Sequence, residues 1–176
     1  MKIYMIAGKA GAGKNTTANY IKEYYEQNGK KTVITEMSKY LKLYAEEIVG
    51  WDRKRETKPR TFLQSVGDFV RKEAFTDTFF IDRILEDMKV YEKFADIVII
   101  ADVRYPMEID AIKNNYDAII IDVVNEFSEY DLKPNEKKHA SENALNSYDK
   151  FDYIIHNKTF EQLKNDAINI VKEVER

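Results

Sequence analysis

The segment GKAGAGKNTTA, residues 8–18, has the residue types and the spacing to bind phosphate groups. It satisfies the pattern GxxxxGK, in which the glycines let backbone N–H groups point inward and the lysine reaches the outer phosphates. The helix expected after it adds its N-terminal N–H groups and its dipole. This pattern, the P-loop, predicts a site for a nucleoside triphosphate, which we take to be ATP. The residues expected to bind ATP here are Gly8, Gly11, Ala12, Gly13, Lys14, Asn15 and Thr16.

Asn15 stands where the P-loop pattern asks for Ser or Thr, whose hydroxyl oxygen normally binds magnesium. The amide oxygen of asparagine is acceptable to a hard cation, and magnesium keeps several of its ligands as water. Asp102 ends the apolar segment 95–103 and is expected to be the second metal anchor, with a strand-end turn cap as its alternative role. We therefore expect Mg2+ as a cofactor near Asn15 and Asp102, and leave the metal contact of Asn15 open.

A second group of polar residues follows helical spacing. Arg60, Gln64, Gly67 and Arg71 lie at i, i+4, i+7 and i+11, which places them on one face of a helix. Guanidinium groups fit phosphate oxygens, an amide can read a base edge, and Gly67 lets a flat ligand come close. The alternative is a solvated charged face. We interpret the set, with Lys42 added, as a binding site for a phosphate acceptor.

Arg104 follows Asp102 by two residues and is expected to project into the same cleft. An arginine there could bridge donor and acceptor phosphates and spread the charge of a transition state. The alternative is an ion pair with Glu108 or Asp110. The expected catalytic residues are therefore Lys14, Asp102 and Arg104.

Short apolar segments that alternate with helical segments predict the architecture. Strands are expected at 2–7, 31–36, 95–103, 117–124 and 151–156, and helices at 14–28, 38–50, 60–75, 79–92, 106–115 and 159–174. Strands that are apolar on both faces indicate a five-stranded parallel sheet with helices on both faces, which is an α/β fold. Ligands of such sheets bind beyond the carboxyl ends of the strands, where residues 8–14 lie. In the last helix, Phe160 and Leu163 begin one apolar stripe.

The composition excludes several classes of function. The chain has 176 residues, a net charge of −3, no cysteine and two histidines. These values argue against broad nucleic-acid or membrane affinity, disulfides and a multi-histidine metal site. No apolar run is long enough to span a bilayer. We expect a single domain, 1–176, that is cytoplasmic and has small-molecule nucleotides as partners, with no nucleic acid and no membrane. A homodimer is left open.

Four segments in order, GKAGAGKNTTA, RTFLQSVGDFVR, DVRYPMEIDAIK and HASENAL, resemble the deoxynucleoside monophosphate kinases of bacteriophages and their bacterial relatives. The resemblance covers most of the chain and implies a P-loop NTPase of adenylate-kinase-like fold. It implies an acceptor-binding region at about 36–92 and a lid at about 125–142. In that family Asp usually follows the loop lysine, so Asn15 is a near substitute. The resemblance assigns Lys14 to ATP, Arg104 to the phosphate-transfer centre, Arg60, Gln64 and Arg71 to the acceptor nucleotide, and Asn157 to the donor adenine.

The resemblance also places Lys137, Lys138, His139 and Glu142 on the lid. Such lids often carry arginine, whereas residues 125–142 contain none. Lysines would stand in as point charges with poorer directionality.

The implied activity is transfer of the γ-phosphoryl group of Mg–ATP to a (deoxy)nucleoside monophosphate. The second pKa of a monophosphate is about 6, so its attacking oxygen is already ionised and no general base is needed. A kinase of a small-molecule hydroxyl is one alternative, with Asp102 or Glu36 as its base. A non-catalytic nucleotide-binding switch is another. Specificity for guanine is disfavoured, because Phe160 stands where the sequence NKxD requires Asp.

Overall fold

The computed structural model describes residues 1–125 and 132–176. Residues 126–131, which belong to the expected lid, lie outside the described residues. The five strands are β1 (Lys2–Ala7), β2 (Thr32–Thr35), β3 (Ile97–Val103), β4 (Ala118–Val124) and β5 (Tyr153–His156). They form one sheet in the order β2-β3-β1-β4-β5, and every neighbouring pair is parallel. The carboxyl ends of all five strands therefore meet at one edge.

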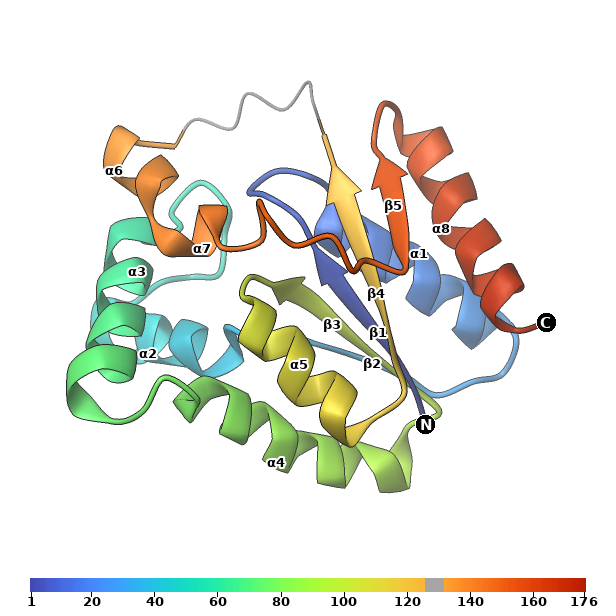
Figure 1. Cartoon of the computed structure of the whole chain (residues 1–176), viewed down its shortest axis with the longest axis horizontal. Helices are drawn as coiled ribbons and strands as arrows, with labels where there is room; N and C mark the ends of the chain where they lie inside the picture. Colours follow the sequence, from blue (N-terminus) through green and yellow to red (C-terminus); the bar gives the residue numbers. More distant parts are fainter. Residues whose placement is uncertain (126–131) are drawn as a thin grey trace.

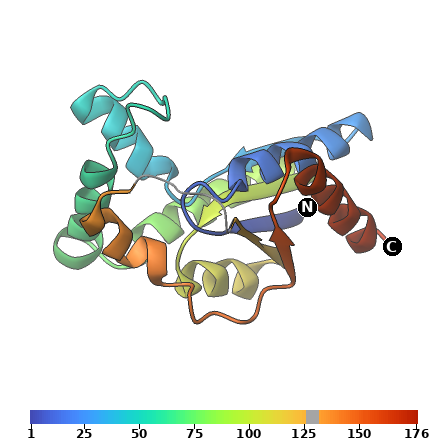
Figure 2. The same cartoon turned by 90° about the horizontal axis from the view of Figure 1, so that it is seen from above.

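Helices cover both faces of this sheet. The helices are α1 (Lys14–Gln27), α2 (Lys39–Val49), α3 (Arg60–Phe69), α4 (Phe79–Phe94), α5 (Pro106–Asn115), α6 (Pro134–Lys138), α7 (Ala140–Asn143) and α8 (Phe160–Val174). Helices α1 and α8 lie on one face, and α4 and α5 lie on the other (Figures 1 and 2). The predicted α/β fold with a five-stranded parallel sheet is confirmed.

The alternation of side chains along each strand explains why both faces need a cover. In β1, Tyr4 and Ile6 pack with the helices α1 and α8, whereas Ile3 and Met5 pack with α4 and α5. None of these four side chains is exposed to solvent. A strand that is buried on both faces fits the interior of a parallel sheet, which is the position of β1.

A third apolar cluster lies away from the sheet and joins α2, α3 and the start of α4. Its core includes Leu41, Ala45, Leu63 and Phe80. In Figure 1 these helices stand at the left, beyond the carboxyl ends of the strands. The single helix predicted for 60–75 is α3 followed by a π-helical turn, η1 (Val70–Ala74). This cluster anchors the helix that carries the predicted acceptor-binding residues.

The last helix departs from prediction at its first residue. The side chain of Thr159 accepts a hydrogen bond from the backbone N–H of Gln162 at 3.1 Å, which begins α8 as expected. Phe160, predicted to begin the apolar stripe of this helix, is 74% exposed and does not join the buried residues of that stripe. As the first helical residue it precedes the turn in which α8 reaches the core at Leu163. Among the residues that the structure describes, no helix is long and apolar enough to cross a membrane.

Candidate active site

The P-loop curls tightly between β1 and α1. Gly8, Gly11 and Gly13 have φ values of 134°, 77° and 111°, a region that side chains other than glycine rarely adopt. A Cβ on Gly8 would lie 2.4 Å from the carbonyl oxygen of Val123, and one on Gly13 would lie 2.7 Å from Nδ2 of Asn157. Glycine is therefore required at both positions, because the loop packs directly on β4 and on the segment after β5.

Asn157 contacts the P-loop itself. Its Nδ2 donates a hydrogen bond to the carbonyl oxygen of Ala12 at 2.8 Å. The side chain ties the segment after β5 to the loop that is expected to hold the donor phosphates.

Lys14 lies over the P-loop. Its Nζ donates to the carbonyl oxygens of Gly8 and Lys9, both at 2.8 Å, and the residue is only 7% exposed. Burial, and then the nearby guanidinium of Arg104, hold the pKa of Lys14 well below its usual value. An anion that entered the loop would favour the charged form of this lysine.

Asp102, at the end of β3, lies in a network of charges. It accepts a hydrogen bond from the hydroxyl of Ser38, and its Oδ2 is 3.6 Å from Nζ of Lys42. The same Nζ is 2.6 Å from Oε2 of Glu36. Burial alone would raise the pKa of Asp102, but Lys42, the hydrogen bond from Ser38 and Arg104 outweigh it and leave the pKa below its usual value. Asp102 is therefore ionised and paired at neutral pH.

The predicted acceptor residues meet in one small pocket of about 100 Å³ between α2, α3 and the end of β3. We call it the small pocket. Its cations and amide are Lys42, Lys58, Arg60, Gln64, Arg71 and Arg104. The spacing along α3 and η1 thus identified a face that turns inward to the pocket.

Arg71 is held against aromatic rings. Its guanidinium carbon lies 4.9 Å from the ring centroid of Tyr105 and 5.2 Å from that of Phe80. A Cβ on Gly67 would lie 2.9 Å from Nη1 of Arg71. The flat group that packs on Gly67 is therefore the guanidinium of Arg71, and the interpretation of Gly67 as a platform for a ligand is wrong.

Sequence reasoning missed Lys58. This lysine lies in the charged connection before α3, and it lines the small pocket. Burial, followed by repulsion from Lys42 and Arg60, lowers the pKa of Lys58 to about 8. An anion in the pocket would offset the part of this shift that comes from Lys42 and Arg60. The only sequence signal was its place two residues before Arg60.

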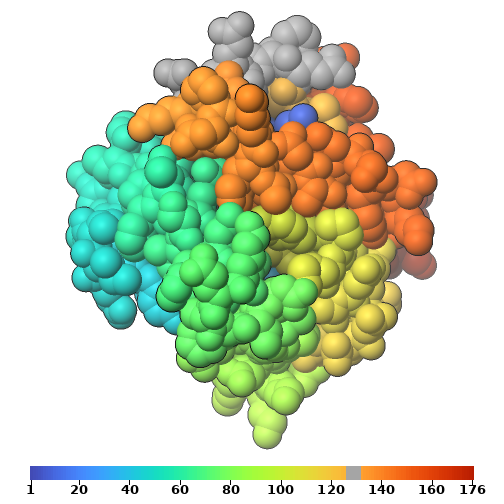
Figure 3. Space-filling model, turned by 60° about the vertical axis from the view of Figure 1, so that its left-hand side comes forward, coloured from blue at the N-terminus to red at the C-terminus, as the bar shows by residue number. Residues whose placement is uncertain are grey.

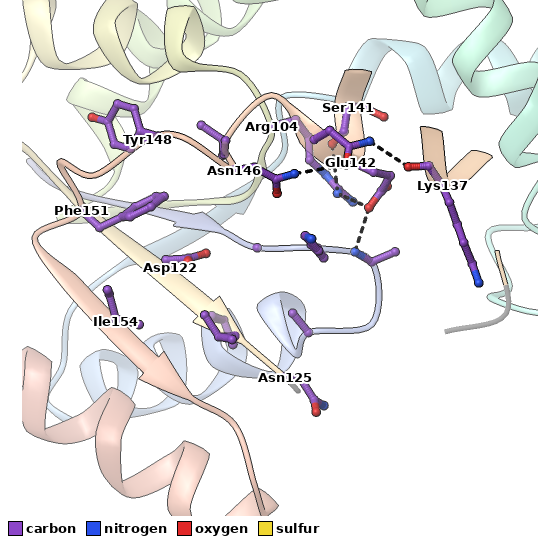
Figure 4. Close-up of a pocket in the computed structure, with 18 of the residues that line it drawn as sticks. Arg104, Asp122, Asn125, Lys137, Ser141, Glu142, Asn146, Tyr148, Phe151 and Ile154 are labelled. Atoms are coloured by element: carbon purple, nitrogen blue, oxygen red, sulfur yellow. Dashed lines mark hydrogen bonds and ion pairs between the residues drawn. The ribbon is translucent and has the colours of Figure 1, made fainter. Parts of the chain in front are cut away.

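Arg104 takes a partner that the sequence did not indicate. Its Nη1 lies 3.1 Å from Oε2 of Glu142 and 3.4 Å from the carbonyl oxygen of Ser141 (Figure 4). Glu108, which was considered as an ion-pair partner, instead accepts the backbone N–H groups of Arg104 and Tyr105 on Oε2, at 2.7 and 3.0 Å. The side chain of Arg104 is therefore directed into the cleft, while Glu108 holds its backbone.

Burial raises the pKa of Glu108 to about 7, although its two backbone hydrogen bonds oppose the shift. The folded protein then binds more protons than the unfolded chain between pH 4.5 and 7. Stability should therefore fall as pH rises through this window, by about 1.4 kcal/mol for each unit of raised pKa. In Glu108→Gln the amide oxygen keeps both hydrogen bonds, and this fall should disappear.

Chemical denaturation at pH 4.5, 6 and 8 measures this effect as the difference between wild type and Glu108→Gln. Other titrating groups cancel in that difference. The difference should change in favour of the variant by about 3 kcal/mol between the ends of the range. A constant difference would show that Glu108 is not buried in the way described.

Residues 132–142, the described part of the predicted lid, pack on α3, which carries predicted acceptor-binding residues, as the orange and green surfaces of Figure 3 show. Glu136 is buried. Its Oε1 accepts from the hydroxyl of Thr61 at 3.1 Å, and its carbonyl oxygen accepts from Nε2 of Gln64 at 3.3 Å. Nε2 of His139 lies 3.3 Å from Oδ1 of Asp68, without hydrogen-bond geometry.

Two further residues of the predicted lid, Lys137 and Lys138, are exposed, and Lys137 lines a cavity described below. Glu136, which connects this segment to α3, was not identified from the sequence, although it is the most deeply buried of residues 132–142.

A second cavity, of about 880 Å³, lies between the P-loop, the end of β4 and the segment that carries α7 (Figure 4). We call it the large cavity. Gly8, Lys9 and Ala10 line it on the loop side, and Asp122 and Asn125 line it on the strand side. Arg104, Ser141 and Glu142 line both cavities, so the two meet at these residues. The site is thus two adjoining cavities with one arginine at their boundary.

Similar solved structures define the class of fold. They include shikimate kinase from Aquifex aeolicus, with 13% identity, a TM-score of 0.54 and coverage of 99% of this chain and 98% of that chain. They also include an APS kinase of Mycobacterium tuberculosis, with 7% identity, a TM-score of 0.53 and coverage of 97% and 96%. At such identities the likeness shows the fold alone, which is that of a P-loop kinase.

The family is shown by sequence. The profile of the deoxynucleotide monophosphate kinases matches residues 29–167. The chain belongs to this family, as the resemblance predicted, and family and fold together make it a phosphotransferase. No curated protein matches the chain in sequence. Because the matched range begins after the P-loop, residues 8–14 are independent evidence for phosphate binding.

Proposed function

We propose that the protein transfers the γ-phosphoryl group of ATP to a (deoxy)nucleoside monophosphate and forms the diphosphate. The observation that carries this proposal is the position of Arg104 at the boundary between a cavity lined in part by P-loop residues and a pocket that gathers several cations. Two polyanions that bind on the two sides of this residue would bring their phosphates together. The acceptor region is then about 36–92, and the lid is about 125–142.

On the donor side, the triphosphate of ATP binds the P-loop amides and recruits Lys14 from the carbonyl oxygens of Gly8 and Lys9. The N-terminus of α1 adds further N–H donors. Residues 11–16 and Asn157 complete the contacts to ATP. The large cavity, which continues from the loop along β4, has room for the rest of the nucleotide.

On the acceptor side, the monophosphate binds in the small pocket. Lys42, Lys58, Arg60 and Arg71 supply positive charge, and Gln64 supplies an amide. The lowered pKa of Lys58 supports this assignment, because a dianion would relieve the repulsion among these cations. The walls formed by Leu63 and Phe80 are apolar and suit a base or sugar, and the pocket must widen beyond its about 100 Å³ when the acceptor binds.

In the transfer step, an ionised oxygen of the acceptor phosphate forms a bond to the γ-phosphorus. The bond between that phosphorus and the bridging oxygen of ATP breaks, and ADP leaves. Lys14 and Arg104 spread the negative charge over the protein, and the closed lid excludes water. No side chain has to remove a proton.

The protein could supply only some of the ligands that a magnesium ion needs at this site. Among the described residues there is no cluster of three or more His, Cys, Asp or Glu that could hold a metal. Asp102 is ionised and Asn15 is exposed at the start of α1, so the two could supply oxygens while phosphates and waters supply the rest. The ion would neutralise phosphate charge when bound.

The alternative of a hydroxyl kinase needs a carboxylate base. Both candidates, Asp102 and Glu36, are paired with Lys42, and Lys42 helps to hold the pKa of Asp102 below its usual value, which makes Asp102 a weaker base. The absence of cysteine also fits the cytoplasm, where we expect these nucleotides and the protein to be.

The experiment is a panel of acceptors with ATP and Mg2+, followed by release of ADP and by chromatography of the product. Deoxynucleoside monophosphates should give diphosphates, and sugars and other small-molecule alcohols should give no phosphorylated product. Turnover of alcohols alone would support the hydroxyl kinase, and tight ATP binding with no acceptor-dependent ADP release would support the switch.

Arg71→Ala should chiefly weaken acceptor binding. The guanidinium offers two N–H groups to one phosphate, and its loss should raise the acceptor KM by about 10- to 100-fold while the ATP KM stays within about twofold. Arg71→Lys keeps the charge but loses the two-pronged guanidinium, so its acceptor KM should lie between that of wild type and that of Arg71→Ala. Steady-state kinetics with each substrate varied measures the effect. An unchanged acceptor KM in Arg71→Ala would place the acceptor elsewhere.

A further inference from the structure

The carboxylate of Glu142 lies where the two cavities meet. Its Oε2 accepts the backbone N–H of Ala10, in the P-loop, at 3.1 Å, and the same atom is 3.1 Å from Nη1 of Arg104. The side chain of Glu142 is only 10% exposed. Figure 4 shows it reaching from α7 to the loop, with both contacts dashed.

Both partners of this oxygen are groups that bind anions. A P-loop amide and a guanidinium are the donors that a phosphoryl oxygen would use at this boundary. A carboxylate and a phosphate cannot share them without repulsion, since each carries negative charge in a poorly solvated place. Lys14, the third anion-binding group, donates hydrogen bonds to the carbonyl oxygens of Gly8 and Lys9. The protein therefore satisfies these donors with its own oxygens.

The segment that carries Glu142 also touches the acceptor helix. Helix α7 directly follows α6, whose Glu136 bonds to Thr61 and Gln64 on α3. A change at α3 when the acceptor binds is thus connected through a few residues to the position of Glu142.

We propose that Glu142 determines the specificity of transfer by occupying the anion position between Ala10 and Arg104 until both nucleotides are bound. This inference rests on the proposed function. With ATP alone, the carboxylate competes with the terminal phosphate for Arg104, which suppresses transfer to water. Binding of the acceptor on α3 shifts the lid segment, and Arg104 is released to the transferring phosphoryl group.

The test is Glu142→Gln. Its amide oxygen can still accept from Ala10, but the negative charge is gone. Inorganic tripolyphosphate, measured by calorimetry, should bind about tenfold tighter than to wild type, the effect of one charge-assisted hydrogen bond. Hydrolysis of ATP without acceptor should rise by about the same factor. A purely structural role would instead weaken binding and lower the melting temperature.

Two further variants make the result unambiguous. Asp110→Asn, an exposed carboxylate on α5, removes the same charge and should change neither quantity by more than about twofold. Glu142→Ala should increase tripolyphosphate affinity and ATP hydrolysis as Glu142→Gln does. It serves as the test variant if Glu142→Gln is unstable. Unchanged or weaker tripolyphosphate binding in both Glu142 variants would overturn the inference alone. Failure of wild type to bind tripolyphosphate or ATP would overturn the proposed function with it.

Discussion

Replacing Lys14 by alanine should lower kcat by about a thousandfold or more, the effect of removing a preorganised charge from a phosphoryl-transfer site. This ammonium is the side-chain cation of the P-loop pattern, and in the structure it lies within the loop at 2.8 Å from two loop carbonyl oxygens. Its lowered pKa shows that the folded protein holds the charged form at a cost. Removal should therefore reduce activity far more than stability. Single-turnover kinetics with saturating ATP and acceptor measures the loss.

Lys14→Met is the matched control for packing. Methionine fills the place of the buried aliphatic stem without a charge, so it should be as inactive as Lys14→Ala. Both variants should melt within about 5 °C of wild type, because less than about 1 kcal/mol of stability is at stake. Activity above about a tenth of wild type in either variant would contradict the role given to Lys14.

Arg104→Ala should also lower kcat by about a thousandfold, which is the low end of the effect of an arginine that stabilises phosphoryl transfer. Arg104 lines both cavities, so its guanidinium can contact the phosphoryl group while it is transferred from the donor to the acceptor. Its effect should appear in kcat, with the KM of ATP and of the acceptor changed less than about fivefold, because the contact forms chiefly in the transition state.

The ion pair with Glu142 complicates this variant. Arg104→Ala leaves a largely buried carboxylate without its cation, and part of the loss could be misfolding. In the double variant Arg104→Ala, Glu142→Gln, the melting temperature should recover while kcat stays low. Recovery of kcat together with stability would show that Arg104 only compensates the charge of Glu142.

Much of the fold followed from local pattern. β-Branched runs such as 97–103 identify buried strands, and the P-loop spacing identifies a strand-to-helix turn, because both depend on neighbouring residues. The inward face of α3 and η1 could be predicted for the same reason, since Arg60, Gln64 and Arg71 repeat at helical spacing. That these residues lie near Arg104 was expected from the parallel sheet, because it brings the carboxyl ends of its strands to one edge.

The contacts that join these parts were not readable. Ala10 and Glu142 are 132 residues apart, and Thr61 and Glu136 are 75 apart, so no periodicity connects them. Phe160 was misplaced because helical spacing gives a direction around the axis but not the point at which the helix meets the core. Gly67 was misread because a bare glycine does not reveal which flat group packs on it.

The most direct test of two adjoining nucleotide sites is a crystal structure with a bisubstrate analogue, in which adenosine and a deoxynucleoside are joined by five phosphates. We predict that the adenosine end lies with the P-loop and the large cavity, and the deoxynucleoside end lies in the small pocket against Arg71 and Gln64. The phosphate chain should pass Lys14 and Arg104, with the carboxylate of Glu142 displaced from Ala10. An analogue that occupies only one cavity, or a chain that turns away from Arg104, would contradict the account.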